Sequence, residues 1–152
     1  MANLRATKRM MATCTVFIVD AKSPRLALAK KLIEKYTPKL GLTGWAFYLS
    51  EGSSQDLAGD DGMTVLARMH EALPGLRRAS IVINNEIDVT PGLGLDCSHG
   101  GYAIRTFEEV IVHEMAHVVF AEAGSDAFWA DNKAFQILEE RLCDRIAQVA
   151  TV

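Results

Sequence analysis

Two histidines and a glutamate stand close together in the second half of the chain, in the pentapeptide His113-Glu114-Met115-Ala116-His117. In a helix, residues i and i+4 share one face, so both imidazoles could reach a single metal ion. Glu114 would then lie beside that ion, placed to act as general base on a metal-bound water. This spacing predicts a catalytic metal centre, and zinc is the ion that such a donor set usually binds.

The residues around this motif are almost all apolar between positions 110 and 120, so the helix that carries it should be buried. An unpaired buried polar group costs roughly 1–3 kcal/mol. One Zn²⁺ per chain would give both imidazoles and the carboxylate of Glu114 a partner. The alternative is a pair of core histidines that hydrogen-bond to backbone carbonyls, while Glu114 forms an ion pair nearby.

A third metal ligand is expected, because catalytic zinc usually takes three protein ligands and leaves a fourth position for water. No histidine follows His117, so the candidates are carboxylates of the last predicted helix or a residue of the upstream loop. Glu140 and Asp144 lie four residues apart on that helix. One of them could bind the ion while the other accepts the second N–H of a ligating imidazole.

A helical wheel of the last helix favours a different glutamate. Its apolar arc, which we expect to face the core, contains Phe135, Leu138, Leu142, Ile146 and Val149. Glu139 falls at the edge of this arc, whereas Glu140 points nearly opposite it. A carboxylate on the buried face is the one that needs a cation, so the residues alone leave Glu139 and Glu140 both open.

Together, the pentapeptide and residues 140–144 (Glu-Arg-Leu-Cys-Asp) resemble the gluzincin metallopeptidases, in which H-E-x-x-H is followed by E-x-x-x-D on a later helix. The second stretch is also similar to the E-x-x-A-N/D pattern of ImmA/IrrE-type and small phage metallopeptidases. The resemblance covers about residues 106–147. It implies a zinc-dependent peptidase that hydrolyses peptide bonds, with metal ligands His113, His117 and Glu140, general base Glu114, and Asp144 orienting a ligating histidine.

The glycine-rich segment before the motif offers further candidates. Cys97 combined with the H-E-x-x-H motif is similar to the metal site of peptide deformylases, so a deformylase-like metallohydrolase is the alternative enzyme. His99 or Tyr102 could donate a hydrogen bond to an oxyanion. A non-catalytic interaction module on the same scaffold is a further alternative, although a purely structural site needs no base such as Glu114.

The elements that must position these residues are mixed at first and helical at the end. Patterns of β-branched and aromatic residues predict strands at 15–19, 45–49 and 79–84. Caps and apolar spacing predict helices at 24–36, 65–73 and 106–123, a last helix from Ser125 or Asp131 toward Ala147, and a polar loop at 52–62. These elements indicate an α+β fold, a compact zincin-like single domain. A small mixed sheet should pack on the active-site helix and the C-terminal helix that carries the glutamates.

The whole chain narrows the function classes. With 152 residues it can bury one core, and we expect a flexible terminus at 1–12 and one metallopeptidase domain at 13–152. A net charge of −3 argues against nucleic acid and anionic membranes as partners. The resemblance to metallopeptidases implies a protein or peptide substrate. Three cysteines, an odd number at unrelated spacings, indicate a reducing compartment. Without a membrane-length apolar run or a convincing signal-peptide cleavage site, a cytoplasmic location is expected.

Overall fold

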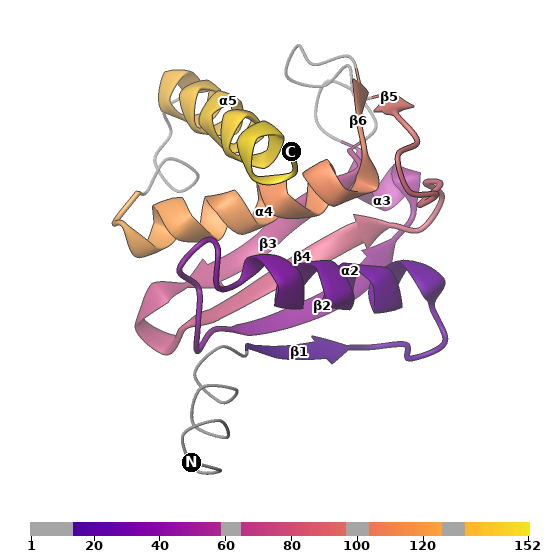
Figure 1. Ribbon diagram of the computed structural model, residues 1–152, viewed down its shortest axis with the longest axis horizontal. Helices are drawn as coiled ribbons and strands as arrows, with labels where there is room; N and C mark the ends of the chain where they lie inside the picture. Colours follow the sequence, from indigo (N-terminus) through magenta and orange to yellow (C-terminus); the bar gives the residue numbers. More distant parts are fainter. Residues whose placement is uncertain (1–13, 59–64, 97–103, 126–132) are drawn as a thin grey trace.

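The main sheet has four strands in the order β1-β2-β4-β3, and two helices cover one of its faces (Figure 1). The computed structural model describes residues 14–58, 65–96, 104–125 and 133–152. The strands are β1 (Thr15–Ile18), β2 (Ala46–Gly52), β3 (Ala67–Leu73) and β4 (Arg78–Asn84). Strands β1, β2 and β4 run parallel, and β3 pairs antiparallel with β4 along one edge. All three strands predicted from the sequence are confirmed.

The helix predicted at residues 65–73 is wrong, because this segment forms the edge strand β3. Apolar residues at helical spacing suggested a helix, but the register of β3 against β4 shifts between Met69 and Glu71 and leaves His70 as a bulge. A bulge breaks the two-residue alternation by which a strand is recognised. The short 3-10 helix η1 (Pro74–Leu76) then turns the chain into β4.

Helices α2 (Pro24–Tyr36) and α4 (Phe107–Glu122) pack on one face of the sheet. Helix α2 begins after the predicted cap Ser23, whose hydroxyl accepts a backbone N–H of the first turn. Thr106 caps α4 in the same way, and Gly124 follows the end of α4 with a φ of +93°. Both predicted boundaries of the motif helix are therefore confirmed.

Helix α5 (Lys133–Ala150) forms a further layer, because it lies on α4 on the side away from the sheet (Figure 1). The smaller elements are α3 (Ser54–Leu57), inside the segment predicted as a loop, and the strand pair β5 (Leu95–Asp96) and β6 (Ile104–Arg105). A mixed sheet packed on the motif helix, with the C-terminal helix above it, is the predicted α+β architecture. The predicted flexible terminus at 1–12 lies outside the described residues.

The apolar core lies between the sheet and the two helices that cover it. Trp45 and Phe47 from the sheet side and Ile111 and Met115 from α4 are among its largest buried side chains. Helix α4 is buried at every position from 110 to 118, as its apolar sequence predicts. From the described part of α5, only Ala147 belongs to the buried core cluster. Helix α5 is therefore held to α4 largely through other contacts. Across the described residues, none of the helices combines the length and the apolarity that a membrane span requires.

Candidate metal centre

The histidine-glutamate motif forms a buried cluster on α4. His113, Glu114 and His117 are all buried, and one candidate ligand atom from each lies within 4.8 Å of the others. The i and i+4 spacing therefore does bring both imidazoles to one face of a helix. Buried nitrogen and carboxylate donors at this separation could hold a metal ion.

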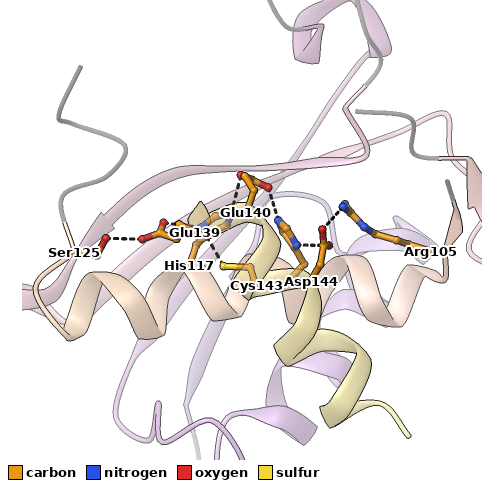
Figure 2. Close-up of polar contacts among 8 residues, drawn as sticks. Arg105, His117, Ser125, Glu139, Glu140, Cys143 and Asp144 are labelled. Carbon is orange, nitrogen blue, oxygen red and sulfur yellow. Dashed lines mark hydrogen bonds and ion pairs between the residues drawn. The ribbon is translucent and has the colours of Figure 1, made fainter. Parts of the chain in front are cut away.

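Glu140 of α5 approaches both imidazoles at once. Its Oε2 lies 2.8 Å from His113 Nε2, and its Oε1 lies 3.0 Å from His117 Nε2. One carboxylate therefore spans the two ring nitrogens that point toward a common position (Figure 2). Two imidazoles and a carboxylate are a frequent ligand set of catalytic zinc, so the donors present fit that ion.

The other ring nitrogen of each histidine also faces a carboxylate. His113 Nδ1 lies 2.8 Å from Asp144 Oδ1, and His117 Nδ1 lies 2.9 Å from Glu139 Oε2. Carboxylates in this position fix the tautomer and the orientation of a metal-ligating histidine. Both imidazoles are therefore held with Nδ1 bonded and Nε2 directed at Glu140.

These two carboxylates are themselves anchored (Figure 2). The Arg105 guanidinium donates to Asp144 Oδ2 at 2.6 Å, and the Ser125 hydroxyl donates to Glu139 Oε1 at 2.5 Å. Sequence reasoning missed both Arg105 and Ser125. No periodicity links Arg105 to a residue 39 positions later, and Ser125 showed only as a possible helix start.

The expectation that the apolar arc of α5 faces the core is wrong. The buried residues of α5 are Glu139, Cys143, Asp144 and Ala147, so the helix turns a largely polar face toward α4. The physical reason is the neighbour, because α4 presents two buried imidazoles whose ring nitrogens need partners. The Glu139 side chain is 7 % exposed and that of Glu140 is 34 % exposed, so Glu139 is the more buried of the two although the apolar arc does not face the core. Glu140 nevertheless approaches both Nε2 atoms, whereas Glu139 contacts Nδ1 of His117.

The charges of the cluster are strongly coupled. Burial alone lowers the pKa of His113, but hydrogen bonds to Asp144 and Glu140 outweigh it and raise this pKa to about 9. Burial also opposes a charge on His117, yet contacts with Cys143, Glu139 and Glu140 raise its pKa as well. Burial disfavours the Glu140 carboxylate, but the two histidines hold its pKa well below the usual range. The surrounding carboxylates therefore favour the protonated form of both imidazoles, and a bound cation would have to displace those protons.

Glu114 has a different environment from the other carboxylates. Its burial raises the pKa of the carboxyl group, although the charges of His113 and His117 act in the opposite direction. A raised pKa moves a carboxylate toward the operating pH of most enzymes, which suits a group that must both take and return a proton. Glu114 is thus the residue of the cluster whose properties fit proton transfer.

We expect the metal-free protein to lose stability as the pH rises. The pKa of His113 is about 9 in the folded protein, above its ordinary value of 6.5. Protonation of His113 therefore stabilises the fold fully below pH 6.5, and this stabilisation is lost as the pH rises through 9. The contribution of this group amounts to about 3 kcal/mol. Urea unfolding of metal-free protein at about pH 6 and about pH 10 measures it. The zinc-loaded protein should lose less free energy of unfolding over the same pH range. If the stability of the metal-free protein stays level or rises with pH, the raised pKa of His113 is contradicted.

A pocket of about 200 Å³ adjoins the cluster on the side of β3. Its lining residues are Met69, His70, Glu71 and Ala72 from β3, with His117, Ala121, Ser125 and Glu139. The edge strand and the β-bulge at His70 thus form one wall of a space that reaches the second histidine of the motif. A ligand in this space would lie beside the metal cluster and along a sheet edge.

Three of the predicted candidates cannot be placed. Cys97, His99 and Tyr102 lie outside the described residues, so neither the deformylase-like alternative nor the oxyanion donors gain or lose support from the geometry.

The sequence matches no protein-family model, and no curated protein and no solved structure is similar enough to count as a match.

Proposed function

We propose that the protein is a zinc-dependent peptidase of the gluzincin type. The observation that carries this proposal is the convergence of His113 Nε2, His117 Nε2 and the Glu140 carboxylate beside the buried Glu114. A structural zinc site is normally closed by four protein ligands. Three donors with an adjacent acid of raised pKa are instead typical of a hydrolytic site, where one coordination position serves water or substrate.

The residues of this chain then divide the work. A bound zinc ion would supply a Lewis acid and a water whose pKa is close to 7. Glu114 takes a proton from the attacking water while the oxygen of that water bonds to the carbonyl carbon of the peptide. Glu114 then returns a proton to the amine nitrogen as the C–N bond breaks, which releases a carboxylic acid and an amine. Asp144 and Glu139 keep the two imidazoles in the orientation that zinc binding requires.

A peptide substrate is supported by the position of β3. This strand forms one edge of the described sheet, and its residues line the pocket beside His117. An exposed strand edge offers backbone N–H and C=O groups to an extended chain, which can add to the sheet as a further strand. A protein or peptide bound in this way would run past the metal cluster. The two described cysteines, Cys14 and Cys143, are free thiols, which supports the proposed reducing, cytoplasmic setting.

Chelation and reconstitution test the proposed activity. The purified protein is incubated with a mixture of unmodified and N-formylated peptides, and the products are identified by mass spectrometry. Cleavage of internal peptide bonds should disappear with a chelator, return with zinc, and not return with magnesium, which prefers oxygen ligands. Removal of only an N-terminal formyl group would favour the deformylase-like alternative. Peptides left intact by the zinc-loaded protein would favour the non-catalytic one.

A further inference from the structure

Helix α5 separates its charges between two sides. Its acidic residues Glu139 and Asp144 are buried and Glu140 bonds both histidines, so all three belong to the side that meets α4. Its cationic residues Arg141 and Arg145 are exposed and lie beside Leu138 on the helix circumference, away from Glu139. The outer side of the helix is therefore positively charged although the chain as a whole carries −3.

The same outer side carries a stripe of large apolar residues. Leu138, Leu142 and Val149 are 51 %, 41 % and 72 % exposed, and Phe135 at the start of the stripe is 60 % exposed. Positions 135, 142 and 149 are seven residues apart, and position 138 falls between the first two. This is the repeat by which one helix packs its side chains into the spaces of another, except that Arg145 takes the apolar position between residues 142 and 149. In Figure 1, α5 is the outermost helix, with α4 beneath it.

We propose that the outer face of α5, formed by Leu138, Leu142 and Val149 with Arg141 and Arg145 along one edge, binds an amphipathic helix of another protein. The partner helix has an apolar stripe that is bordered by acidic residues. The fifteen residues from 135 to 149 span about 21 Å, which is about four turns and enough for two heptads. Acidic residues beside the partner's stripe would face Arg141 and Arg145, as charged residues that border the apolar seam of a coiled coil do.

The charge pattern disfavours a second copy of this chain as the occupant. In an antiparallel pair of α5 helices the same edges meet, so Arg141 and Arg145 would face the corresponding arginines of the other copy. A membrane surface is also disfavoured, because the stripe covers only about 60° of the helix circumference and interfacial helices need a wider apolar face. The inference concerns the outer side of α5 and does not depend on the proposed enzymatic activity.

Two synthetic helical peptides serve as probes, with the same leucine heptads but with either glutamate or lysine beside the stripe. Fluorescence anisotropy with the full zinc-loaded chain should show at least about tenfold tighter binding of the glutamate peptide at low salt. The double variant Arg141→Glu and Arg145→Glu should reverse this preference, and Leu142→Asp should weaken both peptides. The double variant Lys30→Glu and Lys31→Glu on α2 carries the same charge change at exposed positions and should bind as wild type does.

Three outcomes would overturn the proposal. Equal affinity for the two peptides, or a preference unchanged by the two arginine substitutions, would remove the charge argument. A dimer in sedimentation experiments that dissociates in the Leu142→Asp variant would identify a second copy as the occupant. Co-sedimentation with anionic phosphatidylserine vesicles that is lost in the same variant would identify a membrane surface instead.

Discussion

Replacing Glu114 with glutamine is expected to lower kcat/KM for peptide cleavage by about 10²–10⁴-fold, the range that a positioned general base contributes. Glutamine has the same shape as glutamate but accepts no proton at its amide, so zinc and the fold should both be retained. Since burial raises the pKa of Glu114, its charge is unfavourable in the folded state. Thermal stability should therefore stay level or increase in this variant, as is common when a catalytic group is removed.

The exposed Glu122 at the end of the same helix provides a matched control. Glu122→Gln makes the same chemical change on α4, and it should leave activity, zinc content and stability at wild-type values. Kinetic measurements on both variants, with zinc content determined for each, separate loss of the base from loss of the metal. Full activity in Glu114→Gln with one zinc bound would contradict the role of Glu114.

The second large effect is expected at the adjacent glutamates of α5, which form a matched pair. Glu140→Ala removes the carboxylate that lies against both Nε2 atoms, whereas Glu139→Ala removes a partner of His117 Nδ1. Loss of such an orienting partner typically weakens metal binding 10–100-fold. Loss of a direct ligand should weaken it further, so Glu140→Ala should have the larger dissociation constant for zinc.

Competition with a zinc-binding chromophore measures both dissociation constants under the same conditions. The two variants have the same net charge, so a non-specific electrostatic effect would weaken them equally. A larger loss in Glu139→Ala than in Glu140→Ala would move the third ligand to Glu139. Undiminished affinity in both variants would point to Cys97, the alternative ligand that the sequence offers.

The parts of the site that depend on local spacing could be predicted from the sequence. The paired histidines of α4 need only a helix of known register, and Thr106 and Gly124 mark where that helix begins and ends. Their burial followed from the apolar residues around them. Local sequence thus contains what is needed to assemble the half of the site that a single helix provides.

The contacts between elements could not be predicted, for identifiable physical reasons. The bulge at His70 hid an edge strand, because it interrupts the alternation of β3. The predicted rotation of α5 about its own axis was wrong, because the wheel assumed an apolar neighbour, whereas α4 offers imidazoles that bond Glu139, Glu140 and Asp144. Arg105 carries no sequence signal for its contact with Asp144. A contact between two elements depends on the side chains that both of them place at the contact, and the residue pattern of one helix holds only half of that information.

X-ray absorption at the zinc edge, on protein loaded with one equivalent of zinc, tests the central claim most directly. If His113, His117 and Glu140 hold the ion, the spectrum should show nitrogen and oxygen neighbours at about 2.0–2.1 Å with imidazole scattering, and no sulfur. A sulfur neighbour at about 2.3 Å would place a cysteine thiolate in the site and contradict the assignment of Glu140 as the third ligand. Failure to bind zinc at all would leave His113 and His117 as buried histidines held by carboxylates, with no metal centre.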